Sequence, residues 1–398
     1  MKLKTSSLLI AGALFSAAVM PAHANNEAMM DLLKVLRDQG TITAANYDLL
    51  SNAAKADKEA SEAVKMSAEK ADKNTSTLKK LSWAEKIKIK GDTRFRYENR
   101  VTEDQQDTDR LRIRARVGVY AQVNDDVKAG MRFVSTSNDA TSTNETLDDN
   151  FESSNLGWDL AYIDWAPSAL GGDSRFIFGK MKKPWQKVND LIWDGDTNPE
   201  GVAYAGKFKM SGFTLLPSVG YYALGDDTNG GSSIFEDSHL VHAQLAAKIG
   251  KIAKVGISYY GFESQEGEEP GGSDVQNEEQ LTEIFGESKI PGTPFKVYGS
   301  FVTNSNNNAT GDDNAFSLGT SAKFGNLKAG YEYRDTGEDA INYNFDNSDF
   351  QDGSKGHILK AGYKIDKNFS LGSTYFITER NSDGRDRERF QLDLKANF

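Results

Sequence analysis

The sequence predicts an all-β transmembrane antiparallel β-barrel of about 16 strands, preceded by an α-helical periplasmic segment. The chain starts with a secretion signal, yet no other run approaches the roughly 18 uncharged apolar residues of a membrane-spanning helix. Most of the remaining chain alternates apolar and polar residues, which is the period of a strand with one apolar and one wet face. The chain also ends on such a strand.

The first 24 residues predict a cleaved signal peptide. A basic start, Met1-Lys-Leu-Lys4, precedes an apolar run from Leu8 to Val19 and the small-residue cleavage site Ala22-His-Ala24. We therefore expect the mature chain to begin at Asn25. An export signal without a helical anchor leaves three destinations: the periplasm, the outer membrane and the medium.

The last nine residues select among these destinations. Apolar and polar side chains alternate up to a final aromatic residue, and this pattern resembles the C-terminal strand that the barrel-assembly machinery of bacteria recognises. The expected assembly signal consists of Phe390, Leu392, Leu394 and Phe398. We therefore expect a protein of the bacterial outer membrane, in contact with lipid and lipopolysaccharide.

The composition excludes several classes of function. The chain has no cysteine, which removes disulfides, thiolate metal sites and cysteine nucleophiles. His239 and His242 lie three residues apart in an extended stretch and would face opposite sides of a strand, which disfavours a zinc site. No phosphate loop, dinucleotide fingerprint or hydrolase motif occurs, so we expect no enzyme, no cofactor and no bound metal. Removing Lys2 and Lys4 with the signal changes the formal net charge from −11 to −13, which argues against nucleic-acid binding.

Residues 25–82 predict a helical segment distinct from the barrel. A short helix over 27–39 ends at Gly40, and Thr43 caps a longer helix that runs to about residue 81. Two interpretations of the longer helix stay open: a coiled coil, formed because the barrel holds three chains together, or a single solvated helix. The weak seven-residue repeat behind the first interpretation consists of Leu50, Ala53, Asp57, Ala60, Val64, Ser67, Ala71, Asn74, Leu78 and Leu81.

Residues 83–398 predict the barrel itself. Seven short gaps and eight long ones alternate between the strands, as an even-stranded barrel with periplasmic turns and extracellular loops requires. Counts of 14 or 18 strands are the alternatives, because each boundary is defined only to within a few residues. The sixteen expected strands cover about 87–98, 110–123, 127–136, 158–166, 174–182, 201–209, 212–223, 238–249, 252–262, 280–289, 295–304, 315–324, 327–334, 356–365, 368–378 and 387–398.

The first strands carry the sharpest chemical signal, a basic face opposite an apolar one. A cation on the lipid face costs about 2–4 kcal/mol at mid-membrane, so the basic face must line the lumen. The alternative is a face that lines water without shaping selectivity. The expected pore-lining basic residues are Lys88, Lys90, Arg94, Arg96, Arg110, Arg112, Arg114, Arg116 and Arg132, with Lys128 extending the patch.

The third long loop, residues 183–200, supplies a candidate partner for the basic wall. It mixes acids with apolar side chains, which need a place to be buried, whereas the other long loops are acidic and either solvated or bound to divalent cations. We therefore expect the loop to fold into the barrel and to select solutes by size and charge, although a lid on the outer rim is the alternative. The expected constriction acids are Asp190, Asp194, Asp196 and Glu200, alongside the apolar Trp185, Leu191, Ile192 and Trp193.

Several features together resemble one family: the signal, the helical segment, the sixteen strands, the motif-like stretch 179–202 and the terminal Phe398. They resemble the bacterial outer-membrane putative porin family, which is related to the general and phosphate-selective porins. The resemblance implies a homotrimer of water-filled barrels whose third loop folds inward as the constriction. Phosphate-selective relatives line their channel with arginines. Here Arg112, Arg114 and Arg116 are suggestive, but no second basic ladder is evident.

The expected function is a passive diffusion channel for small hydrophilic solutes, with an anion bias set by the basic wall and the infolded acidic loop. One alternative is a channel specific for phosphate or an anionic metabolite. A structural alternative is an outer-membrane protein whose residues 27–82 tether it to the cell wall, with peptidoglycan as a partner. A hydrolase would need a nucleophile near His239, His242 or His357, and no such signature occurs.

Overall fold

The computed structural model describes residues 25–398 except 82, 136–138, 149, 151–152, 154, 172, 225–237, 264–278, 306–311, 343–344 and 346–348. The predicted signal peptide lies outside the described residues. The chain divides into two compact units between Glu85 and Lys86, one helical and one formed by strands. In the part of the chain that is described, no helix is both long and apolar enough to cross a bilayer.

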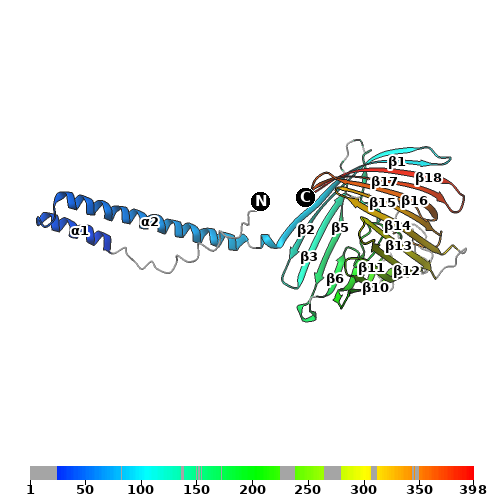
Figure 1. The fold of residues 1–398 in the computed structure, drawn as a ribbon, viewed down its shortest axis with the longest axis horizontal. Helices are drawn as coiled ribbons and strands as arrows, with labels where there is room; N and C mark the ends of the chain where they lie inside the picture. Colours follow the sequence, from blue (N-terminus) through cyan, green and yellow to red (C-terminus); the bar gives the residue numbers. More distant parts are fainter. Residues whose placement is uncertain are drawn as a thin grey trace, which may run out of the picture. The chain divides into compact units, whose positions relative to one another are not determined.

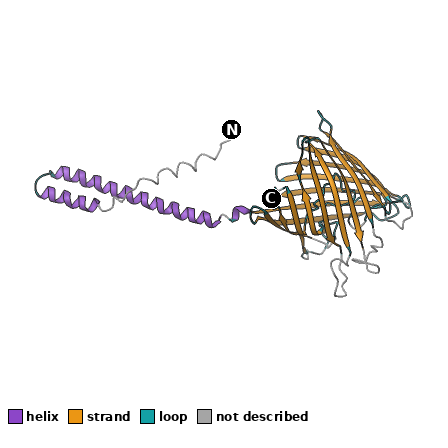
Figure 2. Cartoon of the chain, turned by 90° about the horizontal axis from the view of Figure 1, so that it is seen from below, coloured by secondary structure: helices purple, strands orange, loops and turns teal. Residues whose placement is uncertain are grey.

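The helical unit is a hairpin of α1 (Asn25–Asp38) and α2 (Ala44–Leu81), as Figure 2 shows. Both predicted helices are therefore present. Gly40 takes the positive φ of 69° that the turn requires, and Thr43 accepts a hydrogen bond from the backbone of Asn46 at 3.3 Å as the N-cap. Leu33 of α1 is buried near the start of α2, whereas most of the remaining α2 surface is exposed.

The second unit is an 18-stranded antiparallel sheet that closes on itself, because β1 pairs with both β2 and β18 (Figure 1). Two strands, β4 and β8, have only 2 residues each, so sixteen long strands remain, as the sequence predicted. The first long strands are β1 (Ile87–Thr102), β2 (Thr108–Gln122), β3 (Val127–Ser135), β5 (Leu156–Trp165), β6 (Ser174–Lys180) and β7 (Glu200–Gly206). Next come β9 (Phe213–Ala223), β10 (His239–Ile249), β11 (Ala253–Glu263), β12 (Gln280–Lys289) and β13 (Phe295–Asn304). The last are β14 (Asn314–Phe324), β15 (Leu327–Thr336), β16 (Ser354–Lys364), β17 (Phe369–Arg380) and β18 (Asp386–Asn397), while the short β4 and β8 cover Glu145–Thr146 and Phe208–Lys209.

The two faces of the barrel differ in polarity as the alternation predicted. Along β14, Phe316 and Leu318 are exposed on the outer face, whereas Ala315 and Ser317 are buried on the inner face. Large apolar side chains at the outer surface suit lipid, because alternate residues of a membrane strand contact the hydrocarbon. Short turns join the strands at the end where β1 begins and β18 ends, and long connections join them at the opposite end.

The closing seam brings the last residue against β1. The backbone amides of Gly91 and Phe398 each donate to the other residue's carbonyl at 3.0 Å. A Cβ atom at Gly91 would lie 2.3 Å from the ring of Phe398 and 2.4 Å from the carbonyl oxygen of Arg116, so only glycine fits between these strands. Leu392 and Leu394 lie on the exposed outer face of β18.

Candidate functional site

The inner faces of β1 and β2 place their basic residues side by side. The register sets Arg94 opposite Arg114 and Arg96 opposite Arg112. Successive rungs of this kind are about 7 Å apart along the strands, because every second residue shares a face. The side chains of all four arginines are largely buried inside the barrel.

The neighbouring strand β18 adds a second column of cations. Arg389 lies opposite Arg100 and Lys395 lies opposite Arg94, across the seam that closes the barrel. The expectation of a single basic ladder is therefore wrong. Arg387 and Arg389 alternate visibly in the sequence, but their position beside β1 follows only from closure, which joins residues nearly 300 positions apart.

Carboxylates on the same strands neutralise part of this wall. Arg96 donates two hydrogen bonds to Asp393, at 2.6 and 2.9 Å. Asp92 pairs with both Arg114, at 3.0 Å, and Arg116, at 2.7 Å. Opposite charges of this kind let like-charged neighbours share a sheet that they would otherwise destabilise.

A single buried carboxylate, Glu98, serves several arginines at once. Its oxygens lie 2.6 Å from Arg110, 3.4 Å from Arg100 and 3.9 Å from Arg96. Gln391 donates a further hydrogen bond to Glu98 at 2.9 Å. One negative charge therefore faces three positive ones at this level of the wall.

Arg112 has a different environment, since neutral groups hold it. Its Nη2 donates to the Ser142 hydroxyl and to the Asn144 carbonyl oxygen, both at 3.1 Å, and its Nε has no hydrogen-bond partner. Arg94 donates to the side-chain oxygen of Asn144. Both partners belong to residues 142–144, which the sequence analysis placed in an outer loop but which lie buried against the wall.

The connection between β6 and β7, residues 181–199, crosses the barrel interior. The backbone N–H of Gln186 donates a hydrogen bond to the side-chain oxygen of Gln244 on β10, at 2.7 Å. Asn189 donates to Ser300 on β13 at 2.8 Å. These contacts with inner-face residues place the loop inside the lumen at both positions.

Arg334 of β15 holds the middle of this loop. Its side chain is 1% exposed and pairs with Glu332 at 2.7 Å. The guanidinium lies over the Phe350 ring, 4.9 Å from its centroid, and donates to the backbone carbonyl of Asp190 at 3.2 Å. Sequence reasoning missed this residue, because nothing local indicates that an arginine on a distant strand contacts the loop.

An aromatic cluster fixes the same loop against the strands opposite the basic wall. Trp185 lies 5.0 Å from Trp193 and 4.7 Å from His242, measured between ring centroids. Burial of rings and aliphatic groups is the main gain available to a loop inside a polar barrel. This packing explains why the inner faces of the strands that contact the loop are apolar, although the inner face of a water-filled barrel is ordinarily polar. The buried cluster includes Ile177, Met181, Leu191, Ile192, Ala203, Tyr222, Leu240, Tyr260, Phe262, Leu281, Val302, Ala315, Ala340 and Ile341.

Two acids of the loop, only two residues apart, have opposite ionisation behaviour. Burial would raise the pKa of Asp196, but the nearby Arg114 and other arginines outweigh it and lower that pKa to about 2. Asp196 accordingly pairs with Arg114 at 3.1 Å and with Arg116 at 3.6 Å. Burial raises the pKa of Asp194 well above its ordinary value, and the negative charges of Asp196, Asp349 and Asp190 add to the increase.

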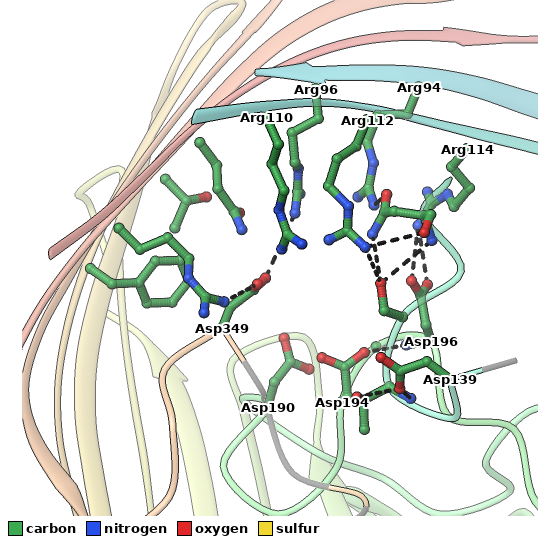
Figure 3. A pocket seen from close by; sticks show the side chains of 18 of the residues that line it. Arg94, Arg96, Arg110, Arg112, Arg114, Asp139, Asp190, Asp194, Asp196 and Asp349 are labelled. Atoms are coloured by element: carbon green, nitrogen blue, oxygen red, sulfur yellow. Dashed lines mark hydrogen bonds and ion pairs between the residues drawn. The ribbon is translucent and has the colours of Figure 1, made fainter. Parts of the chain in front are cut away.

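These groups surround a cavity of about 690 Å³. Figure 3 shows that the side chains of the arginines extend from one wall of the cavity toward aspartates on the other side. Opposed rows of charge across a narrow space set up a transverse electric field that acts on every passing ion. The predicted residues that line it are Arg94, Arg96, Arg110, Arg112, Arg114 and Arg116 with Asp190, Asp194 and Asp196. The cavity also contains Arg100, Lys182, Asp349, Lys360, Arg387 and Arg389, which the sequence analysis did not select.

Other predicted residues lie away from this cavity. Lys88 and Lys90 are exposed near the start of β1, on the same face as Arg94. Arg132 pairs with Asp159 at a different part of the wall. Glu200 begins β7 and pairs with Lys180, so it stands apart from the other loop acids.

Further cavities share lining residues with the central one, and two of them extend toward the long loops and past the inner loop. A cavity of about 320 Å³ near the long loops shares Arg100 and Arg387 with it. A cavity of about 430 Å³ on the other side of the loop shares Asp190 and Lys360. The three cavities therefore adjoin, which is the arrangement that a continuous path through the barrel requires.

A family model described as a putative porin matches residues 101–310. Among solved structures, OmpF of Salmonella typhi in complex with daunomycin is 10% identical with a TM-score of 0.54, covering 78% of this chain and 97% of that one. A porin triple mutant of Rhodopseudomonas blastica is 11% identical with a TM-score of 0.49, covering 78% of this chain and 100% of that one. At these identities the likeness concerns the fold alone. No curated protein matches the chain.

Proposed function

This chain belongs to the putative porin family, whose members are channels of the bacterial outer membrane, and we propose that it conducts small hydrophilic solutes passively with a preference for anions. The observation that supports the preference is the central cavity. Its arginines outnumber the carboxylates that pair with them, so the local potential is positive although the whole chain is acidic. A positive constriction raises the local concentration of anions and speeds their entry.

The loop of residues 181–199 is proposed to be the size filter. Contacts with β10 and β15, and the pairing of Asp196 with Arg114 on β2, hold it across the lumen, and its aromatic cluster fills the part of the lumen lined by β9–β14. Solutes are then left with the path beside the arginine wall. Passage needs no energy source, because the gradient of the solute drives it.

The reversal potential of the purified protein in a planar bilayer under a salt gradient tests this proposal. The informative variant is Arg112→Ala/Arg114→Ala/Arg116→Ala, which removes three charges from the wall. The matched control is Lys34→Ala/Lys55→Ala/Lys58→Ala, which removes the same charge from the helical unit. We expect anion preference in the wild type and control, and a clear decrease in the wall variant. Cation preference that the wall variant leaves unchanged would contradict the assignment.

The proposed assembly is a homotrimer in which the helical hairpins associate. Apolar residues on the hairpin are exposed, including Leu32, Leu49 and Val64, which are 57%, 72% and 60% exposed. An isolated two-helix unit of this kind gains stability by burying such residues against other copies. The intact protein can be cross-linked in detergent, and the mass of the cross-linked species then tests whether it is a trimer.

Export and insertion complete the proposal. Residues 1–24 would serve as the signal peptide, and Phe390, Leu392, Leu394 and Phe398 as the signal for the barrel-assembly machinery. The support for the latter is the outer face of β18 that Phe390, Leu392 and Leu394 share, together with the seam contact of Phe398. Contact with lipopolysaccharide through the outer loops, and with peptidoglycan through residues 27–82, belongs to the same proposal.

A further inference from the structure

Two arginines of the cavity, Arg94 and Arg112, are oriented mainly by neutral groups. Arg94 and Arg112 lie on adjacent rungs of β1 and β2, a diagonal relation in which side chains come within reach of one another. Asn144 links them, because its side-chain oxygen accepts from Arg94 and its backbone carbonyl accepts from Arg112. A neutral residue therefore occupies the place that a carboxylate takes elsewhere on this wall.

Neither guanidinium has a close acid. Among the described residues, Arg112 makes no ion pair within 4 Å, and the nearest carboxylate oxygen to Arg94, on Asp393, is 3.9 Å away. Arg112 is only 7% exposed, and Nε atoms of both arginines lack a hydrogen-bond partner. Buried charges of this kind are costly unless an opposite charge approaches them.

The acids of the surrounding wall pair more closely with other arginines, and Asp349, for example, pairs with Arg389 and Arg96. Glu98 is already shared by three arginines, and Asp92 and Asp196 both pair with Arg114 and Arg116. Arg94 and Arg112 therefore line the cavity with less compensation by acids than the other arginines of this wall (Figure 3).

We infer that Arg94 and Arg112 form a binding site for an oxyanion group that carries two negative charges, such as a phosphomonoester of a small organic solute. Two guanidinium groups side by side match the charge of a dianion and offer several donors to neighbouring oxygens. The volume of about 690 Å³ holds roughly twenty water molecules, so an organic remainder fits beside the oxyanion. The inference rests on the proposed channel function, since the solute must enter the lumen to reach the site.

Block of the single-channel chloride current measures occupation of this site. The probes are glycerol phosphate, inorganic phosphate at a pH where it is dianionic, and acetate as the monoanion. We expect both dianions to reduce the current at concentrations about tenfold lower than acetate does. Stronger block by glycerol phosphate than by phosphate would show that the organic part adds contacts, and equal block that the oxyanion group suffices; both outcomes support the site.

Three variants separate a site from a general positive field. Arg112→Gln should raise the half-blocking concentration of glycerol phosphate about tenfold, and it leaves no buried acid without its partner. Asn144→Asp should abolish the block while keeping both arginines, because the new carboxylate would occupy the site. Lys88→Gln/Lys90→Gln removes cations from the inner face outside the cavity and should leave the block unchanged.

Two results would overturn the inference while leaving the channel intact. One is normal conductance with equal block by acetate and the dianions. The other is a loss of block in Lys88→Gln/Lys90→Gln as large as in Arg112→Gln. Absence of any conductance in the wild type would instead remove the proposed function itself.

Discussion

At the scale of single residues, the pKa values of the acids in the inner loop depend on their neighbours and not on residue type alone. Asp196 contacts Arg114 and stays ionised down to a pKa of about 2, whereas burial leaves Asp194 with a raised pKa. Asp196 therefore carries a constant negative charge, whereas Asp194 gains its negative charge only as the pH rises.

The sign of this effect gives a prediction for pH. As the pH rises through the raised pKa of Asp194, a negative charge appears opposite the arginines, so anion preference should fall with rising pH. Asp194→Asn should reduce the fall. Burial lowers the pKa of Lys183 to about 7, so Lys183 loses its positive charge as the pH rises through that value and also lowers anion preference; Lys183→Met is therefore the companion variant. Reversal potentials measured at a series of pH values test the effect. An equal fall in Asp194→Asn and the wild type would refute the role of this residue.

Arg334 gives the second prediction at this scale. Arg334→Met leaves Glu332 buried without its closest cation, a change that costs about 3–5 kcal/mol, and it releases the loop at Asp190. We expect a lower unfolding temperature and more frequent current fluctuations. Arg334→Met/Glu332→Gln should recover stability while the fluctuations persist. Quiet channels in both variants would show that the aromatic cluster alone holds the loop.

At the scale of elements, the barrel depends on how closely β18 approaches β1. Gly91→Ala places a methyl group 2.4 Å from the Arg116 carbonyl oxygen and 2.3 Å from the Phe398 ring, so the strands must shift. Overpacking of this kind costs about 1–3 kcal/mol, and we expect a lower unfolding temperature in detergent.

Gly286→Ala is the control for this prediction. A Cβ there would lie 3.6 Å from its nearest neighbour, an ordinary contact, so stability should stay close to that of the wild type. The variant Gly91→Ala/Phe398→Ala removes the ring contact but keeps the carbonyl contact, and should recover stability only in part. Equal stability of Gly91→Ala and Gly286→Ala would mean that the seam adjusts without cost.

At the scale of the whole molecule, the helical and barrel units are compact separately. Deletion of residues 27–82 should therefore leave a barrel that conducts with unchanged ion preference, while the oligomer should dissociate at a lower temperature because the hairpins no longer associate. Bilayer conductance and gel mobility after graded heating measure the two effects. Loss of envelope integrity in cells, with an unchanged oligomer, would favour the tethering role instead.

The number of long strands and their inner faces could be predicted from the sequence, which also singled out residues 183–200 as a loop expected inside the barrel. These features follow from local information: a period of two residues, alternating gap lengths, and the apolar content of Trp185 and Trp193 within an otherwise polar loop. Six of the predicted arginines line the cavity, because parity along a strand decides which way a side chain points.

Which charges pair with one another depends on the tertiary structure. Arg389 joins the wall because the barrel closes, Arg334 reaches the loop from a distant strand, and Asn144 folds inward to hold two arginines. Each contact joins positions far apart in the chain. Pairing across such distances depends on barrel closure and on the space left inside, which no local pattern of residues encodes.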